Sequence, residues 1–195
     1  MATRVVTLRS AVLPSATSAA DAILVAGSVA VIAVAAQVSI PLPFTPVPIT
    51  GQTFAVLLTG AVLGSARGVL ATLLYVILGM IGLPFYAGGS SGVQVVMGAT
   101  GGYLIGLVLA AVATGWLAER RWDRRVWSSV LAMLLGEVLI FTSGVGWLMG
   151  VTGVGLAEGL ALGLVPFLIG ESVKLSLAGL LLPSAWKLVN TAPPD

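Results

Sequence analysis

Long apolar stretches with few interruptions dominate the chain. No charged residue occurs in residues 22–66 or in residues 68–118. A helix of about 20 apolar residues already crosses a bilayer, and both stretches are far longer. The pattern predicts an all-α, polytopic membrane protein with a single domain, residues 1–195, folded as a six-transmembrane-helix bundle. We expect the segments at residues 21–39, 52–64, 67–83, 101–117, 127–150 and 166–186.

Two irregular segments interrupt this helical pattern. The predicted helix at residues 52–64 is only about 20 Å long, against a hydrocarbon core of about 30 Å. Before it, residues 40–50 contain four prolines, which exclude a regular helix. Residues 84–102 are charge-free and rich in glycine. Irregular backbone at membrane depth needs surrounding protein or a watery cavity. Since both loops follow odd-numbered segments, we expect them on one side of the membrane.

The basic residues predict the orientation, because Lys and Arg in short loops favour the cytoplasmic side. With the N-terminus inside, all but one of the nine basic residues are cytoplasmic: Arg4, Arg9, Arg67, Arg120, Arg121, Arg124, Arg125 and Lys187. Residues 1–20 and 188–195 then form cytoplasmic ends, so both termini are cytoplasmic, and the irregular loops are external.

The arginine cluster and the tryptophans of the chain also fit a membrane protein. The arginine cluster at residues 120–125 is interpreted as a topology anchor, so the net charge of +2 requires no nucleic-acid partner. Tryptophans near segment ends are interpreted as interfacial anchors: Trp116, Trp122, Trp127 and Trp186.

Cysteine and histidine are both absent from the sequence. This excludes thiol nucleophiles and imidazole bases, and it leaves little basis for a metal site or a cofactor. The glycine-rich run at residues 88–92 lacks the Gly-Lys-Ser/Thr ending of a phosphate loop. An intramembrane hydrolase using Ser90 or Ser91 with Lys174 is a weaker alternative. We expect no catalytic residue and no enzyme activity.

Two opposite charges lie inside the last apolar segment. Lys174 follows Glu171 by three residues, so a helix places both side chains on one face. A charge at the bilayer centre costs about 2.5–3.5 kcal/mol and normally faces a bundle interior or cavity. Counted from Pro166, the pair lies about 7 to 12 Å below the outer end of the segment. We expect it to bind a small polar ring with N–H and C=O groups. The alternative is an ion pair that only helps packing.

Two further features leave their roles open. Glu137, in the fifth predicted segment, is either a structural partner within the bundle or a coupling residue, and we do not place it in the site. In the first segment, Ala22, Ala26 and Ala30 recur at four-residue spacing. Small residues at this spacing allow close helix packing in lipid. Their partner is either another helix of this chain or another subunit.

Several motifs together resemble one family. Pro46-Val47-Pro48-Ile49-Thr50-Gly51-Gln52-Thr53 resembles its Pro-x-Pro-x-Thr-x-Gln-Thr signature, and residues 82–92 and 98–104 resemble its long third loop and the start of its fourth helix. Gly170-Glu171-Ser172-Val173-Lys174 resembles its acidic-x-x-Lys element. The family is BioY, the biotin-binding S component of energy-coupling factor (ECF) transporters. Glu171 replaces the usual Asp, and Ala99 replaces a usual proline.

The resemblance implies a multi-pass protein of the cell membrane that captures biotin from outside with high affinity. It implies assembly with a transmembrane T component, contacted by the alanine-rich first helix, and with cytoplasmic ATPase subunits. Glu171 would accept a ureido N–H of biotin, while Lys174 and loop groups would meet its carbonyl or its carboxylate. The other expected site residues are Thr50, Gln52, Phe85, Gly88, Gly89, Ser90, Ser91 and Tyr103. Two alternatives are an S component for another vitamin and a structural subunit without a ligand.

Overall fold

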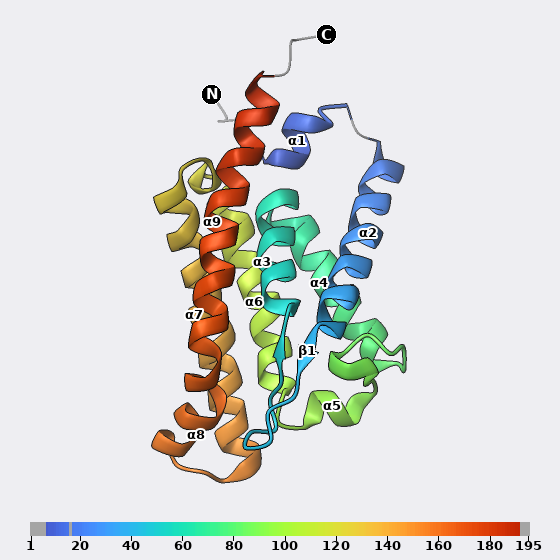
Figure 1. The fold of residues 1–195 in the computed structure, drawn as a ribbon. Helices are drawn as coiled ribbons and strands as arrows, with labels where there is room; N and C mark the ends of the chain where they lie inside the picture. The colour runs from blue at the N-terminus through green and yellow to red at the C-terminus, as the bar shows by residue number, and fades with distance from the viewer. Residues whose placement is uncertain (1–6, 16, 192–195) are drawn as a thin grey trace.

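The computed structural model describes residues 7–15 and 17–191, which are mostly helical (Figure 1). The α-helices are α1 (Leu8–Val12), α2 (Ser18–Gln37), α3 (Gln52–Leu63), α4 (Ser65–Met80), α5 (Val93–Met97), α6 (Gly101–Ala118), α7 (Val126–Thr152), α8 (Leu156–Gly163) and α9 (Leu168–Thr191). Short 3-10 turns are η1 (Ala87–Gly89), η2 (Trp122–Arg124) and η3 (Val165–Phe167). Strands β1 (Ser39–Ile40) and β2 (Ile49–Thr50) pair antiparallel. The predominantly helical prediction is confirmed.

A helix occupies each apolar segment that the sequence predicts, but the helices differ in length. In the described part of the chain, four stretches are long and apolar enough to cross a membrane: α2, α6, α7 and Leu156–Val189, which contains α8 and α9. The shorter apolar helices α3 and α4 have 12 and 16 residues. Many large aliphatic side chains point outward, such as Ile23 (71% exposed) and Ile169 (83% exposed). The chain is a multi-pass membrane protein, because such a surface suits lipid rather than water.

Glycines set the close approach of α6 and α7, which form the most extensive helix contact of the fold. A Cβ atom added to Gly106 would lie 2.6 Å from Cα of Ile140, and one added to Gly102 would lie 2.4 Å from the backbone oxygen of Ser143. In lipid, helix association depends on van der Waals contact, so these positions need the smallest side chain.

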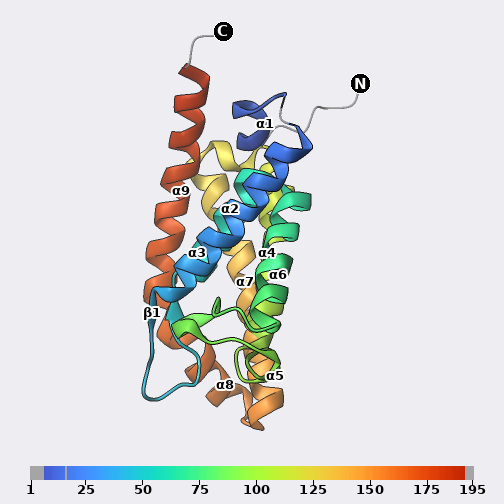
Figure 2. The ribbon, with the colours of Figure 1, turned by 90° about the vertical axis from the view of Figure 1, so that its right-hand side faces the viewer.

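Both irregular segments lie at one end of the bundle, as expected. The hairpin loop between β1 and β2 reaches the same end as α5 and α8, while α1 and the C-terminal part of α9 lie at the opposite end (Figures 1 and 2). Helix α8 was not expected, because residues 151–165 contain four glycines and were not assigned to a segment. It continues the apolar character of α9 toward the loop end.

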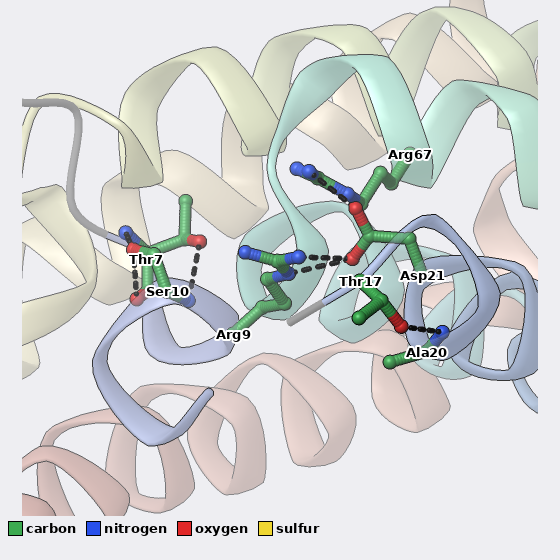
Figure 3. Close-up of polar contacts among 7 residues, drawn as sticks. All are labelled: Thr7, Arg9, Ser10, Thr17, Ala20, Asp21 and Arg67. Atoms are coloured by element: carbon green, nitrogen blue, oxygen red, sulfur yellow. Dashed lines mark hydrogen bonds and ion pairs between the residues drawn. The ribbon is translucent and has the colours of Figure 1, made fainter. Parts of the chain in front are cut away.

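An ionic network ties three helices together at the end that carries α1 (Figure 3). Asp21, in the first turn of α2, accepts a hydrogen bond from Nε of Arg9 at 2.7 Å. Its other oxygen accepts one from Nη2 of Arg67, on α4, also at 2.7 Å. Thr7 and Ser10 form a capping box at the start of α1, and Thr17 caps α2. One carboxylate therefore connects α1, α2 and α4.

The tryptophans expected at the interfaces divide into two groups. Trp116, Trp122 and Trp127 are 47%, 39% and 79% exposed, as interfacial anchors should be. Trp186 is only 3% exposed, and its Nε1 donates a hydrogen bond to Oδ2 of Asp123 at 2.5 Å. The interfacial prediction is wrong for Trp186, because its ring packs inside the bundle against the turn between α6 and α7.

Candidate functional site

A cavity of about 460 Å³ lies under the two irregular segments, between the helices that begin or end there. Five of the predicted site residues line it: Thr50, Gln52, Ser90, Tyr103 and Glu171. Its volume is within the range of about 300–1,000 Å³ that is typical of small-molecule sites. A hollow of this size therefore adjoins Glu171, one member of the charged pair.

The polar wall of the cavity centres on Glu171, in the first turn of α9 and 5% exposed. Its Oε1 accepts a hydrogen bond from Nζ of Lys174 at 2.7 Å, and its Oε2 accepts one from the hydroxyl of Thr53 at 3.0 Å. Lys174 also donates to the backbone carbonyl of Thr50 at 2.5 Å and to the Thr53 hydroxyl at 3.0 Å. The ammonium group has three N–H donors, so this set satisfies all of them.

This arrangement gives the two charges different positions. Glu171 lines the cavity, while Lys174 is not among its described lining residues. A carboxylate offers about four lone-pair directions, so Glu171 can accept further hydrogen bonds from a guest. Its place in the first turn of α9 also favours a negative charge, because the positive end of the helix dipole lies there. Glu171 is thus fixed as an acceptor for N–H groups in the cavity.

Much of the remaining lining is aromatic and aliphatic. Tyr103 on α6 meets Phe141 on α7 edge-on at a centroid distance of 6.1 Å, and Phe141 lies 5.8 Å from Phe167. The Tyr103 hydroxyl donates a hydrogen bond to the backbone carbonyl of Gly163 at 2.7 Å, which fixes the ring beside the cavity. Ile140 completes this apolar surface. Such a wall suits the apolar body of a ligand whose polar edge faces Glu171.

Several predicted residues support the cavity from outside its lining. Phe85 stacks on Tyr75 with ring planes 5° apart, and the Tyr75 hydroxyl donates to the Phe85 carbonyl at 3.2 Å. Gln52 in turn donates from Nε2 to that hydroxyl at 2.8 Å. Gly88 and Gly89 have positive φ angles of 64° and 74° and form the turn next to Ser90. None of Phe85, Gly88, Gly89, Ser91 and Lys174 lines the cavity within the described part of the chain.

Other lining residues were not singled out from the sequence. Thr53, Phe141 and Phe167 line the cavity, as does Tyr86, whose hydroxyl donates to the Val76 carbonyl at 2.6 Å. Burial raises the pKa of Tyr86 to about 12, so its phenol stays neutral and keeps this hydrogen bond. Thr53 stands in the signature that carries the resemblance, whereas the phenylalanines carry no signal beyond an aromatic residue in an apolar segment.

Glu137 lies closer to the charged pair than its sequence position indicates. It is 3% exposed on α7 and interacts electrostatically with Glu171 and Lys174. Neither of its carboxyl oxygens accepts a hydrogen bond from the residues that the structure describes. It lines a second, mainly aliphatic hollow of about 570 Å³ between α7, α8 and α9, whose lining Glu171 also joins. Glu171 therefore stands between the cavity and this hollow.

The profile of the BioY family matches residues 7–191. This chain belongs to the BioY family. It is 39% identical over 152 residues to the biotin transporter BioY of Thermotoga maritima, which covers 78% of this chain and 87% of that protein. It is 36% identical over 149 residues to the biotin transporter BioY of Rhizobium etli, covering 73% and 79% of the two chains. The BioY resemblance that the motifs indicate is thus confirmed.

A solved BioY-like structure has the same fold. A crystal structure of the S component for biotin from an ECF-type ABC transporter superposes with a TM-score of 0.79 at 25% identity. The match covers 89% of this chain and 95% of that structure. The fold is therefore that of an S component, a class of transporter subunit and not of enzyme.

Proposed function

We propose that this BioY protein captures biotin from outside the cell as the S component of an ECF-type importer. The observation that carries the proposal is the cavity, whose lining divides between the Glu171 carboxylate and the aromatic rings of Tyr103, Phe141 and Phe167. Biotin matches this division, because its ureido ring carries N–H donors and a carbonyl while its bicycle is apolar. The relatives of this chain, which are named as biotin transporters, support the same ligand.

In the proposed complex, Glu171 accepts a ureido N–H of biotin. Lys174 holds the Glu171 carboxylate in place through the hydrogen bonds described above. Thr50, Gln52 and Ser90 lie where they can meet the ureido carbonyl or the tail carboxylate. Tyr103, with the two phenylalanines, flanks the bicycle. We assign Phe85, Gly88, Gly89 and Ser91 to shaping the loop above the ligand. No metal or cofactor takes part in this binding.

We also propose the topology expected from the sequence: one S-component domain with six membrane-spanning helices and both termini cytoplasmic. Both irregular segments lie at the end opposite α1 and the last turns of α9 (Figure 2), and residues of both line the cavity. The arginine-bearing turn between α6 and α7 lies at the same end as α1, beside Trp186 of α9. This arrangement is consistent with an external binding site and cytoplasmic basic loops. Lipid surrounds the exposed aliphatic side chains.

The outer face of α2 supports an assembly with a T component and cytoplasmic ATPase subunits. Ala22, Ala26 and Ala30 are all exposed, so they pack against no helix of the described chain. A Cβ atom added to the adjacent Gly27 would have nothing within 4 Å. A flat face of small residues lets a partner helix approach closely in lipid. We assign this face to the T component.

The decisive experiment measures equilibrium binding of biotin, thiamine and riboflavin to the purified full chain. Protein purified from biotin-containing medium should also release biotin on denaturation, detected by mass spectrometry. Tight binding of biotin alone is the expected result. Preference for thiamine or riboflavin would indicate an S component for another vitamin, and binding of none would favour a structural subunit.

A further inference from the structure

A third hollow, lined mainly by arginines, lies at the end of the molecule opposite the cavity. It measures about 410 Å³ and is lined by Arg121, Trp122, Arg124, Arg125 and Ser128. These residues form the turn between α6 and α7, two helices long enough to cross the membrane. The turn therefore lies where those helices leave the bilayer. We refer to this hollow as the arginine pocket.

The arginines of this pocket are not neutralised by ion pairs. Within residues 7–15 and 17–191, no carboxylate forms an ion pair with Arg121, Arg124 or Arg125. The acidic residues on either side have other partners. Glu119 accepts a hydrogen bond from the backbone N–H of Ser65 at 2.8 Å. Asp123 interacts electrostatically with Arg124, but its hydrogen bond comes from Trp186. The pocket consequently keeps a net positive charge.

The position of Arg124 shows that this charge is built into the fold. Its guanidinium carbon lies 4.1 Å from the centroid of the Trp186 ring, which holds the side chain in one place. Its Nε is buried and finds no acceptor among the described residues. A buried donor without an acceptor is costly, so an acceptor supplied from outside would be stabilised there.

The backbone adds further donors at the same point. Arg125 is the N-cap residue of α7, and no side chain caps this end of the 27-residue helix. The first N–H groups of a helix are unpaired and carry a partial positive charge, which attracts anions. Arg121 has a φ of 69°, a left-handed conformation that glycine or asparagine adopts more easily. The guanidinium of Arg124, held on Trp186, the exposed guanidinium groups of Arg121 and Arg125, and the helix N–H groups together suit a phosphate, which accepts forked hydrogen bonds.

The surroundings indicate a phosphate that belongs to a lipid. Trp122 and Trp127 beside the pocket are exposed, as is Val126, so amphipathic and aliphatic groups meet the bilayer there. Basic pockets at the ends of membrane helices suit anionic headgroups. We propose that the arginine pocket binds the phosphate of an anionic phospholipid such as phosphatidylglycerol. Its acyl chains then lie along the apolar surface of α7.

The test compares lipid retention by the purified full chain in native mass spectrometry. Phosphatidylglycerol and phosphatidylcholine with identical acyl chains are added in equal amounts. We expect phosphatidylglycerol to be retained preferentially, and the double variant Arg121→Gln with Arg125→Gln to bind it roughly 25-fold more weakly, about fivefold for each arginine. Arg120→Gln is the matched control, because Arg120 stacks on Trp116 and does not line the pocket. Its lipid retention should match that of the parent protein.

A second pair of substitutions separates binding from membrane topology. Arg121→Lys with Arg125→Lys keeps the positive charges that set orientation but removes the forked donors. We expect it to retain the parent topology and to bind phosphatidylglycerol more weakly. Circular dichroism during heating checks that each variant is folded.

Four results would overturn the proposal. Equal retention of the two lipids by the parent protein would show that the pocket has no preference for an anion. Unchanged retention by the glutamine variant would show that the arginines do not bind the lipid. Binding of inorganic phosphate as tightly as phosphatidylglycerol would identify a site for the free anion instead. Loss of T-component association in the glutamine variant, with lipid retention intact, would also count against the lipid, since it would make the pocket a protein interface.

Discussion

The Thr53 hydroxyl donates a hydrogen bond to Oε2 of Glu171 over 3.0 Å, joining the first turn of α3 to the first turn of α9. The same hydroxyl oxygen accepts a hydrogen bond from Lys174 at 3.0 Å. Because the ammonium group can only donate, the single hydroxyl proton must point toward Glu171. Thr53 therefore sets the orientation of the carboxylate that faces the cavity.

Replacing Thr53 with Val should weaken biotin binding. The substitution keeps the shape of the side chain but leaves a donor of Lys174 and Oε2 of Glu171 without a partner. An unsatisfied buried polar group costs about 1–3 kcal/mol, so we expect an affinity loss of roughly 10- to 100-fold. Isothermal titration calorimetry of the purified protein measures it. Thr53→Ser keeps the hydroxyl and should bind as the parent does; parent-like affinity of the Val variant would show that Thr53 is dispensable.

Replacing Lys174 with Ala should abolish tight biotin binding without preventing membrane insertion. Breaking a buried ion pair leaves an uncompensated charge and costs about 3–5 kcal/mol. Glu171 would then lose its hydrogen bond from Lys174, and the Thr53 hydroxyl would lose the donor that orients its proton toward Glu171. Equilibrium binding with labelled biotin and a membrane-fraction blot separate the two effects. Unchanged affinity in this variant would refute the assignment of the pair.

A double variant distinguishes loss of binding from loss of stability. Glu171→Gln with Lys174→Met removes both charges and restores neutrality, so we expect thermal stability close to that of the parent protein. Biotin binding should still be lost, because the carboxylate acceptor is gone. If this neutral variant binds biotin tightly, the pair serves packing alone.

The local features of this site could be predicted, but its tertiary contacts could not. Glu171 and Lys174 were paired correctly because helix geometry fixes residues three apart on one face. Thr53 lies more than 100 residues away, and its contact depends on how α3 and α9 align, which no local pattern encodes. Glu137 was not placed near the site for a similar reason, because its approach to Glu171 and Lys174 depends on how α7 and α9 align. Helix α7 has 27 residues and is about 40 Å long, so Glu137 lies well inside it.

In the two irregular segments, too, local features could be predicted and tertiary contacts could not. Proline and glycine predicted that residues 40–50 and 84–102 would not be regular helix. Residues 40–50 contain no helix, whereas α5 (Val93–Met97) and the start of α6 lie within residues 84–102. The pairing of β1 with β2 was not predicted, since two residues per strand are too few for an alternating pattern. Phe141 and Phe167 meet only because α7 and η3 converge at the cavity.

Replacing Glu137 with Gln should leave biotin binding intact and raise thermal stability. The Glu137 carboxyl is buried beside Glu171, and none of the described residues donates a hydrogen bond to it. An amide would remove the repulsion between two carboxylates and supply a donor toward Glu171. Thermal unfolding followed by tryptophan fluorescence measures the change. The matched control is Glu158→Gln on α8, where the carboxylate is exposed and no change is expected. A clear drop in Tm for Glu137→Gln would indicate an ionised, functionally engaged carboxylate.

Replacing Asp123 with Asn should stabilise the protein at neutral pH. Burial raises the pKa of Asp123, although the Trp186 hydrogen bond and nearby Arg124 oppose the shift. The folded state then binds a proton more readily than the unfolded chain. Its stability falls as pH rises from the unfolded pKa through the folded pKa, and the full penalty remains above that window. The Asn oxygen can still accept the hydrogen bond from Trp186 but carries no charge.

Thermal unfolding followed by circular dichroism between pH 3.5 and 7.5 tests the predicted direction of this pH dependence. We expect the Asn variant to have the higher Tm at neutral pH and the difference to narrow toward pH 3.5, as Asp123 becomes increasingly protonated in the unfolded state as well. Asp123→Ala is the control, since it removes the acceptor for Trp186 at every pH. A lower Tm for the Asn variant at pH 7 would mean that the charge of Asp123 stabilises the turn.

Replacing Gly106 with Ala should destabilise the bundle and distort the cavity together. The added Cβ would lie 2.6 Å from Cα of Ile140, so backbone faces backbone and no side-chain rotation can relieve the contact. Helices α6 and α7 must move apart, and Ile140 lines the cavity. Overpacking of this kind costs about 1–3 kcal/mol, which should lower both Tm and biotin affinity. Gly146→Ala on α7 is the matched control, because its added Cβ has nothing within 4 Å and should leave both quantities unchanged or raise Tm slightly. Equal behaviour of the two variants would show that α6 and α7 do not need the close approach at Gly106.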